Sequence, residues 1–163
     1  MRFTLSWLKQ FLDTDAMLEK IAHTLTMTGL EIEDIDNKSE DLKNFEVAEI
    51  IEAKQHPDVD KLKVCMVKTK SGMLQIVCGA PNARAGIKVV LANVGTVIPN
   101  GNFKIKKSKI RGVESVGMMC SADEIGISGD PDGIIELKNE AVIGDNVAKY
   151  LGIDDPVLHI NIT

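Results

Sequence analysis

The sequence predicts a mainly β protein in which a small barrel or sandwich is inserted into a discontinuous α+β domain. Five short β-rich runs, each bounded by Gly, Pro or Asn, lie between residues 45 and 137 and indicate the barrel. The two ends of the chain share an α+β character, and the polar stretch DNKSEDLKN (36–44) reads as a linker after the first end. Because chain termini usually lie close together, such an insertion is tolerated. We expect residues 1–38 and 148–163 to form one domain and residues 39–147 the barrel.

The N-terminal segment predicts two helices and a strand. Residues 6–12 form a short amphipathic stretch, and apolar residues then recur at helical spacing over 18–25, with Gly29 placed to end the second helix. Apolar residues separated by acids over 30–35 indicate a strand that runs into the linker.

The barrel strands are expected where β-branched and apolar residues cluster between turn residues. These runs are FEVAEIIEAK (45–54), LKVCMVK (62–68), LQIVCG (74–79), KVVLA (88–92) and GIIEL (133–137). The stretch SADE (121–124) has the serine and glutamate spacing of a capping box, which predicts one short helix before Gly126.

The C-terminal stretch predicts one or two helical turns followed by a strand. DNVAKYLG (145–152) reads as the helical part, and VLHINIT (157–163) alternates Leu158, Ile160 and Ile162 with polar residues, as a half-buried strand does. The strand runs to the last residue without a turn or cap. We therefore expect this chain to be a fragment of a longer polypeptide.

The composition is that of an ordinary globular protein. The apolar fraction is 44%, no apolar run approaches the roughly 18 residues needed to cross a bilayer, and the N-terminus lacks the features of a secretory signal. We expect a cytoplasmic location and no membrane partner. The three cysteines are odd in number and none belongs to a CxxC pair, so we expect buried thiols rather than disulfides or a zinc site.

The net charge of −5 conceals a basic middle third. Residues 54–111 carry twelve Lys and Arg against two acids, whereas residues 112–145 carry one cation against eight acids. Partner choice depends on the local potential rather than on the total charge. The middle of the chain therefore favours an anionic partner.

The motif HPDVDKLKVCMV (56–67) is the first candidate contact region. Pro57 predicts a turn leading into the strand that begins near Leu62. His56, Lys61 and Lys63 could form a rim that faces phosphate. Alternatively, the two lysines are the solvated face of a half-buried strand.

A second candidate region, QIVCGAPNARAG (75–86), is a strand followed by a loop that carries Asn82 and Arg84. Asn offers a donor and an acceptor to a base edge, and Arg offers a fork that matches phosphate. Turns select the same residue types, so a purely structural role is the alternative.

The third and sharpest candidate is KIKKSKIRGVESVGMMCS (104–121). It holds five cations in eight positions, namely Lys104, Lys106, Lys107, Lys109 and Arg111. In an extended chain the first two point one way and the other three the opposite way. Because burying unpaired ammonium groups is costly, the segment must be a twisted edge, a hairpin tip or a loop.

The residues that follow these cations could also meet an anion. Ser115 and Ser121 supply hydroxyls, and the expected helix start at Ser121 would offer free amides toward a phosphate. The alternative for the whole region is an edge strand guarded by lysines against aggregation.

No catalytic constellation is recognisable. The sequence has no Walker-type Gly loop and no GxSxG elbow, and its three histidines are too scattered to suggest a triad or a metal site. Cys65 with His56 is the one conceivable nucleophile pair. An apolar strand context makes such a thiol inert more often than reactive.

Several of these motifs carry a family resemblance. HPDVDKLKVC, QIVCGAPNA, KIRGVESVGMMCS and DGIIEL resemble the tRNA-binding OB-fold module of bacterial phenylalanyl-tRNA synthetase β subunits. FTLSWLKQFLDTD and TLTMTGLEIE resemble the N-terminal segment of the same subunits, in which the OB barrel is inserted into a discontinuous first domain. The resemblance covers almost the whole chain, although the module alone also occurs in other RNA-binding proteins.

The resemblance implies a role in attaching phenylalanine to its tRNA, with ATP and magnesium used by the whole enzyme and an α subunit as partner in an (αβ)₂ heterotetramer. The fragment itself would be non-catalytic and hold no cofactor or metal. Its RNA surface would fall on His56 to Lys63, on Asn82 and Arg84, and on Lys104 to Ser121. No DNA partner is expected.

The mode of RNA binding is also constrained by composition. OB folds that bind unpaired bases usually stack them on aromatic rings, and the barrel region has only Phe45 and Phe103. We therefore expect weak, salt-sensitive binding to the backbone of folded tRNA, through phosphates and 2′-hydroxyls. The alternatives are a protein-interaction scaffold for subunit assembly, a stand-alone tRNA-binding OB module, and an independent thiol or metal enzyme.

Overall fold

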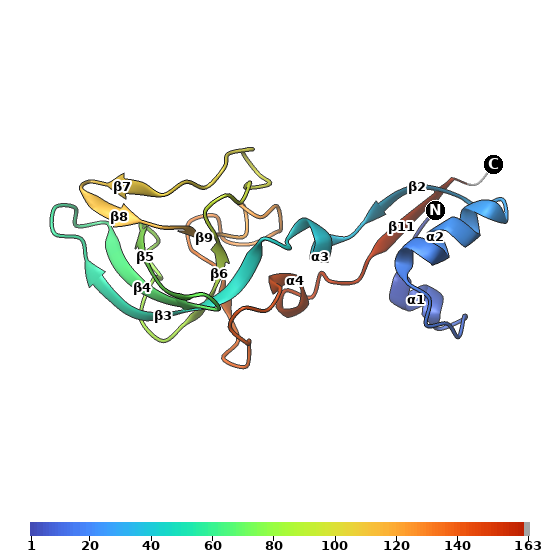
Figure 1. Ribbon diagram of the computed structural model, residues 1–163, viewed down its shortest axis with the longest axis horizontal. Helices are drawn as coiled ribbons and strands as arrows, with labels where there is room; N and C mark the ends of the chain where they lie inside the picture. The colour runs from blue at the N-terminus through green and yellow to red at the C-terminus, as the bar shows by residue number, and fades with distance from the viewer. Residues whose placement is uncertain (162–163) are drawn as a thin grey trace.

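The structure is a computed structural model that describes residues 1–161 and has two lobes along its long axis (Figure 1). A larger β lobe occupies one end, and a smaller α+β lobe with both chain termini occupies the other. In chain order the elements are β1 (Arg2–Thr4), α1 (Leu5–Lys9), α2 (Leu18–Met27), β2 (Glu31–Asp36), α3 (Lys38–Asp41), β3 (Phe45–Gln55), β4 (Lys63–Thr69), β5 (Gly72–Cys78), β6 (Lys88–Ala92), β7 (Ser108–Ile110), β8 (Val113–Ser115), β9 (Met118–Met119), β10 (Glu136–Leu137), α4 (Val147–Tyr150) and β11 (Val157–Asn161).

The β lobe is built on one curled antiparallel sheet in the order β10-β6-β3-β4-β5, with β9 also paired to β6. The chain after β8 returns to the free edge of β5, where the amide of Val116 donates to the carbonyl oxygen of Gln75 at 2.9 Å. Because β9 follows at once and joins β6, the segment 113–119 bridges the two sides of the sheet. The result is a barrel of the OB-fold type, and the predicted fold class is confirmed.

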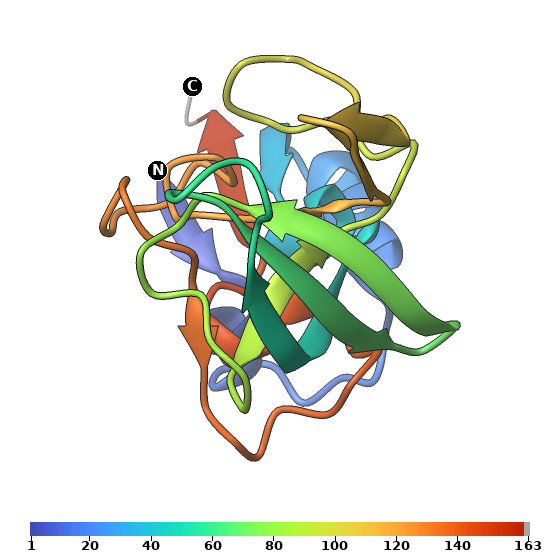
Figure 2. The ribbon, with the colours of Figure 1, turned by 90° about the vertical axis from the view of Figure 1, so that its left-hand side faces the viewer.

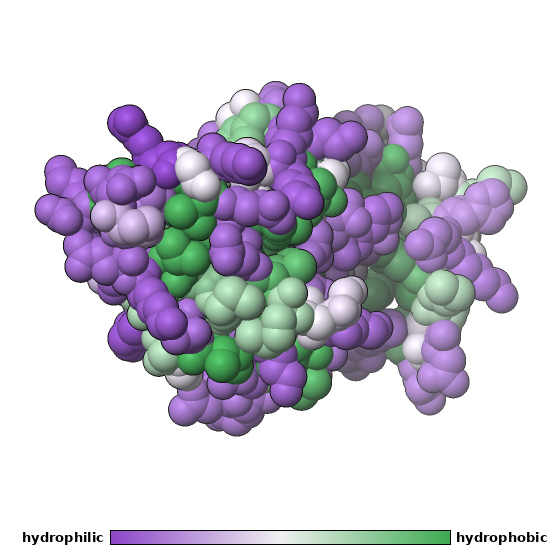
Figure 3. Space-filling model, turned by 60° about the vertical axis from the view of Figure 1, so that its left-hand side comes forward, coloured by the Kyte–Doolittle hydropathy of each residue, from purple (hydrophilic) through white to green (hydrophobic). Residues whose placement is uncertain are grey.

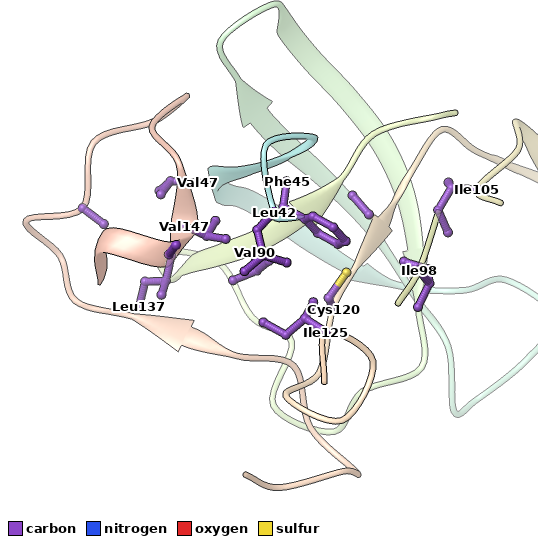
Figure 4. Packing of buried hydrophobic residues seen from close by; sticks show 13 residues of the cluster. Leu42, Phe45, Val47, Val90, Ile98, Ile105, Cys120, Ile125, Leu137 and Val147 are labelled. Carbon is purple, nitrogen blue, oxygen red and sulfur yellow. The ribbon is translucent and has the colours of Figure 1, made fainter. Parts of the chain in front are cut away.

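Strand β6 is buried on both faces, which explains why KVVLA reads as a nearly continuous apolar run. Strand β3 is buried on both faces only in its first half, and there Glu46 and Glu49 stay half-buried. Val47 and Val90 point into a core cluster that also holds Leu42 and Val147 (Figure 4). Their neighbours in the same strands, including Ile50, Val89 and Leu91, point into a second cluster inside the barrel. A strand that is covered on both sides needs apolar residues at every position rather than at alternate ones.

The smaller lobe has a three-stranded sheet in the order β1-β11-β2. Leu158 and Ile160 of β11 are buried and their neighbours are half-buried, as the alternating sequence predicts. Ile162, the third residue of that pattern, lies outside the described residues. Strand β1 was not expected from the sequence. It is only three residues long, and it pairs with β11 from Arg2↔His159 to Thr4↔Val157.

Two local expectations are corrected by the structure. Residues 36–44 are not simply a linker, because they contain α3 and bury Leu42 in the core. Strands β7 and β8 form a hairpin, which was one of the alternatives for the cation-rich stretch, and β9 follows where no β run was recognised. The run GIIEL contributes only the two residues of β10.

The short helix expected at 121–124 does not form, although its capping box does. The amide of Ser121 donates to the Glu124 carboxylate at 2.9 Å, and the amide of Glu124 donates to Ser121 Oγ at 3.3 Å. Gly126, with φ at +79°, then reverses the chain, and the amide of Ile127 donates to the carbonyl oxygen of Ala122. This is the bonding of a helix C-terminus, and it follows the N-terminal cap within one turn. No helix start therefore faces a phosphate here.

Within residues 1–161, none of the helices has the length and apolar character needed to span a membrane.

Candidate nucleic-acid interface

The residues Lys104–Arg111, here called the lysine segment, are held against the barrel by the apolar residue between the first two lysines. Ile105 is buried in the core cluster of Figure 4. Its amide donates to the carbonyl oxygen of Thr96, and its carbonyl oxygen accepts from the amide of Gly95, both at 2.8 Å. In an extended chain, neighbours of a buried residue must point away from the core. The burial of Ile105 thus projects Lys104 and Lys106 outward.

The second half of the lysine segment runs into the β7–β8 hairpin, whose two-residue turn is Arg111–Gly112. Both turn residues have positive φ, +51° and +84°, as type I′ hairpin turns require. Arginine seldom adopts this conformation, so the turn holds the Arg111 side chain at the tip at some conformational cost. The sequence of this segment is compatible with an edge, a hairpin tip or a loop, and its end is a hairpin tip.

Most cations of the lysine segment have no acidic partner. Lys107 pairs with Glu114 across the hairpin at 3.3 Å. Among the described residues, Lys104, Lys106, Lys109 and Arg111 make no ion pair within 4.0 Å. All five cationic residues are exposed. Because nothing inside residues 1–161 neutralises four of these charges, the segment presents a positive edge to solvent.

A cleft of about 520 Å³ lies along the lysine segment from Lys104 to Ile110. Lys104 and Lys106 line it, together with Phe103. The end of β5 and the loop 131–134 also line it. Lys107, Lys109 and Arg111 do not line this cleft, which agrees with the two opposite directions expected of an extended segment.

The turn after β3 lies beside the β7–β8 hairpin (Figure 2), and a buried histidine joins the two. His56 Nε2 lies 3.1 Å from the carbonyl oxygen of Ile110, while its Nδ1 accepts from the amide of Asp58 at 3.0 Å. Since Nδ1 is an acceptor, Nε2 must be the donor. Both ring nitrogens are therefore used inside the protein, and His56 is only 2% exposed.

The two lysines beside this turn have different surroundings. Lys61 is exposed, whereas Lys63 is half-buried and its Nζ donates to the carbonyl oxygen of Ala83 at 2.6 Å. Lys61 is thus free to meet a ligand. Lys63 first has to give up a bond that fixes the loop after β5.

Asn82 and Arg84 bind the loop after β5 to the stretch that precedes β10. The side-chain oxygen of Asn82 accepts from the amide of Ile134 at 3.0 Å, and its amide nitrogen donates to the carbonyl oxygen of Ile134 at 2.8 Å. Arg84 pairs with Glu136 at 2.6 Å. The hydrogen bonds from Arg84 and Asn82 lower the pKa of the Glu136 carboxyl below its ordinary value. This corner is locked by its own contacts, which the turn-residue alternative anticipated.

The two serines of the third candidate region are buried and serve the backbone. Ser115 Oγ accepts from the amide of Val77 at 3.1 Å, and Ser121 Oγ caps Glu124 as described above. Both residues still line the cleft. Their hydroxyls shape its wall, but they are already engaged as acceptors.

Some of the candidate residues lie close together in the structure, but the cations of the basic middle third do not all lie on one surface. The β3–β4 turn that carries Lys61 and the β7–β8 hairpin that ends the lysine segment share one end of the barrel (Figure 1), where His56 bonds to the backbone of Ile110. Lys68 and Lys70 flank the β4–β5 turn at the other end of β4, about 20 Å away at the rise of a strand. Lys88 donates to the carbonyl oxygen of Ala141 at 2.6 Å. The positive surface is therefore smaller than the count of cations in 54–111 suggests.

Three cleft residues were not singled out as contacts from the sequence. Phe103 is 45% exposed on the cleft, whereas Phe45 is buried, and composition alone could not separate the two rings. The alternation Lys-Ile-Lys did carry a signal for Ile105 as an anchor. Glu124 lines the cleft, and one of its carboxylate oxygens accepts from the amide of Ser121. The capping-box spacing indicated the bond to Ser121, but no local pattern indicated that Glu124 would line a cleft.

The thiols show no sign of nucleophilic activation. Burial raises the pKa of Cys65 to about 11, and it also raises the pKa of Cys78 and that of Cys120. His56 is occupied by Asp58 and Ile110, so it is not placed as a base for Cys65. Residues 1–161 contain no group of three or more His, Cys, Asp or Glu side chains placed to hold a metal ion.

The barrel region matches a protein-family model described as "Putative tRNA binding domain" over residues 45–146. The whole chain is 61% identical to the phenylalanine–tRNA ligase beta subunit of Rickettsia bellii and 60% identical to that of Rickettsia conorii. It spans only about a fifth of their length, 19% and 20% respectively. A solved structure of a MetRS related protein from Pyrococcus horikoshii matches 68% of this chain and 95% of that chain, at 22% identity and a TM-score of 0.47. This last likeness is too low to assign a fold or a function.

Proposed function

The chain belongs to the tRNA-binding domain family, and from that premise we propose that the barrel binds the sugar-phosphate backbone of folded tRNA through the lysine segment. The observation that carries the proposal is a set of four exposed cations on one edge that make no ion pair within residues 1–161. Such cations bind phosphates and release counterions from the nucleic acid. The contacts are to backbone phosphates and 2′-hydroxyls, which makes the binding sensitive to shape and to salt.

The proposed contact residues fall into three groups by their exposure and their bonds. The exposed ones meet the RNA directly in this proposal, and they are Lys61, Lys104, Lys106, Lys107, Lys109 and Arg111. His56, Ser115 and Ser121 are buried and position the surface. Lys63, Asn82 and Arg84 hold neighbouring loops in place, and they reach RNA only if their present bonds open.

In the whole protein, the chain is the N-terminal portion of the β subunit of a phenylalanine–tRNA ligase. Identity near 60% over the full chain to two such beta subunits supports this assignment. The chain then holds tRNA while the rest of the enzyme attaches phenylalanine with ATP and magnesium, in a cytoplasmic (αβ)₂ assembly with an α subunit. Residues 1–38 and 148–163 form the discontinuous first domain, and residues 39–147 form the inserted barrel.

The experiment compares two triple variants of equal charge. Lys106, Lys107 and Lys109 are replaced by Ala in one, and Lys9, Lys20 and Lys149, which are exposed outside the barrel strands, are replaced in the other. Fluorescence anisotropy with labelled tRNA measures both affinities. The proposal predicts a loss of at least tenfold for the first variant and less than twofold for the second.

Two results would contradict the placement of the surface. Equal losses in both variants would mean that only the net charge matters. An unchanged tRNA affinity in the first variant would place the RNA elsewhere on the protein.

A first variant that no longer binds an α subunit but binds tRNA as the parent chain does would favour the scaffold function instead.

A further inference from the structure

We propose that the cleft beneath the lysine segment receives one unpaired nucleotide of the bound tRNA, with a preference for bases that carry an exocyclic amino group. The inference rests on the proposed tRNA binding and adds a base-recognising site to it. From the composition we expected no stacking of bases on aromatic rings. The structure changes this expectation because it places Phe103 on the cleft, which the sequence alone could not show.

The dimensions of the cleft fit a single nucleotide. Its volume of about 520 Å³ lies within the range of small-molecule sites, roughly 300–1,000 Å³. It is far too small to admit a duplex. Only a base that has left its stack could enter.

The walls of the cleft offer an apolar surface with one exposed aromatic ring. Phe103 is 45% exposed and lines the cleft together with Met118, Met119 and Ile134. A base that stacks on an aromatic ring is stabilised whatever its identity, because every base has a π face. Hydrophobic residues also come to the surface among hydrophilic ones on the barrel (Figure 3).

The polar groups of the cleft are of opposite sign and do not neutralise each other. Lys104 and Lys106 line it, and so do Glu124 and Asp132. Within residues 1–161, no ion pair joins either lysine to either acid. A ligand that is anionic at one end and a hydrogen-bond donor at the other can satisfy both sets of charges. A nucleotide has this polarity when its base carries an amino group.

The carboxylates determine which bases fit. A carboxylate accepts from the amino group of cytosine, whereas uracil presents a carbonyl oxygen at the same position. One oxygen of Glu124 already accepts from the amide of Ser121, which fixes the side chain and leaves the second oxygen for the base. Cytidine and uridine monophosphate differ at this position, so they form a minimal pair for a test.

The first measurement uses the 163-residue chain with ¹³C-labelled methionine methyl groups. Met118 and Met119 line the cleft, so their methyl signals should shift during titration with 5′-CMP. The affinity of the cleft for 5′-CMP should be at least fivefold higher than its affinity for 5′-UMP. Glu124→Gln keeps an oxygen for Ser121 but adds a donor, so it should abolish or reverse the preference. Asp123→Asn removes the same charge one residue away, outside the cleft, and should leave the preference unchanged.

The second measurement places the nucleotide in tRNA. Phe103→Ala removes the stacking ring and should weaken tRNA binding by about 5- to 150-fold, without changing the slope of log K against log salt. Phe103→Tyr keeps an aromatic ring and should restore most of the affinity. Lys106→Ala should weaken binding and also flatten the slope, because it removes a phosphate contact.

The outcomes separate this inference from the function on which it rests. If Phe103→Ala binds tRNA as tightly as the parent chain while Lys106→Ala is weaker, the nucleotide site is wrong and backbone binding stands. If 5′-CMP binds but Phe103→Ala leaves tRNA affinity unchanged, the cleft takes a free nucleotide and the inference is again wrong. If the parent chain does not bind tRNA at all, the proposed function fails, and the nucleotide site fails with it.

Discussion

His56 Nε2 donates to the carbonyl oxygen of Ile110 at 3.1 Å and so joins the turn after β3 to the hairpin that carries Arg111. The bond spans 54 positions of the sequence. It fixes the lysine segment relative to Lys61, although neither lysines nor RNA take part in it. The proposed RNA surface thus depends on a buried side chain that has no free polar atom for RNA.

Replacing His56 by Ala should destabilise the fold and loosen the RNA surface. The change leaves the Ile110 carbonyl and the Asp58 amide without a partner, at a cost of about 1–3 kcal/mol in the free energy of unfolding. Thermal or urea unfolding measures this loss. The matched control is His23→Ala on the exposed face of α2, for which we expect a change below about 0.5 kcal/mol.

The same variant distinguishes positioning from contact. If His56 only positions the hairpin, His56→Ala should weaken tRNA binding without altering the dependence on salt. A flatter salt dependence would instead identify His56 as a phosphate contact. That result would contradict its position in the structure.

Arg111 occupies a turn position that asparagine or glycine would fill at lower cost. Its φ of +51° suits the Asn-Gly sequence that type I′ turns favour. Arg111→Asn should therefore stabilise the protein by about 0.5–1 kcal/mol in thermal unfolding. It should also reduce tRNA affinity, because it removes an exposed cation. A loss of stability in Arg111→Asn would contradict the conformational cost assigned to the arginine. A tRNA affinity equal to that of the parent would contradict its role as an RNA contact.

The ion pair between Arg84 and Glu136 should make stability depend on pH in the acid range. Its hydrogen bonds lower the pKa of Glu136 in the folded state, so the carboxylate stabilises the fold above its unfolded-state pKa. This contribution is lost as the pH falls through the folded-state pKa. Arg84→Met should be slightly less stable than the parent near pH 7, and the difference should close in acid.

A salt control and one contradicting outcome bear on this expectation. Because the pair is largely exposed, 1 M salt should shrink the difference at pH 7. If the stability difference between the parent and Arg84→Met grew in acid, its pH dependence would be opposite to the one that a lowered carboxyl pKa produces. It would mean that the structure assigns the wrong partner to Glu136.

The three cysteines should be unreactive in the folded protein. Burial raises the pKa of Cys65 to about 11 and also raises that of the other two thiols, so all three are protonated at pH 7. Iodoacetamide should label none of them within an hour under native conditions and all three in denaturant, as mass spectrometry can count. Fast native labelling of Cys65 would revive the possibility of a thiol enzyme.

The sequence predicted the strands of the barrel where burial governs the pattern. The doubly covered strand β6 is a nearly continuous apolar run, and β11 alternates because only one of its faces is fully buried. Strand β3 mixes apolar residues with glutamates because its second half is largely exposed. Strand β1 escaped prediction because it is three residues long and is stabilised by a partner at the other end of the chain. The expected helix at Ser121 failed because a cap predicts where a helix begins and not how far it continues.

The candidate site was predictable in its charges and not in its packing. Exposure of the lysine segment followed from the cost of burying ammonium groups. The capping box predicted that the Ser121 hydroxyl would accept from a backbone amide, but nothing local indicated the same role for Ser115, since a hydroxyl serves a ligand and an amide equally well. The contrast between Phe45 and Phe103 likewise depends on contacts between segments that are far apart in the sequence.

The central claim is that phosphates of tRNA lie against the lysine segment, and the salt dependence of binding tests it most directly. If each of the six exposed cations contacts one phosphate, log K should fall against log salt with a slope of about −4 to −5. The variant with Ala at positions 106, 107 and 109 keeps three of these contacts, so its slope should be about −2 to −3. If the slope of this variant equals that of the parent chain, the lysine segment does not contact the RNA backbone.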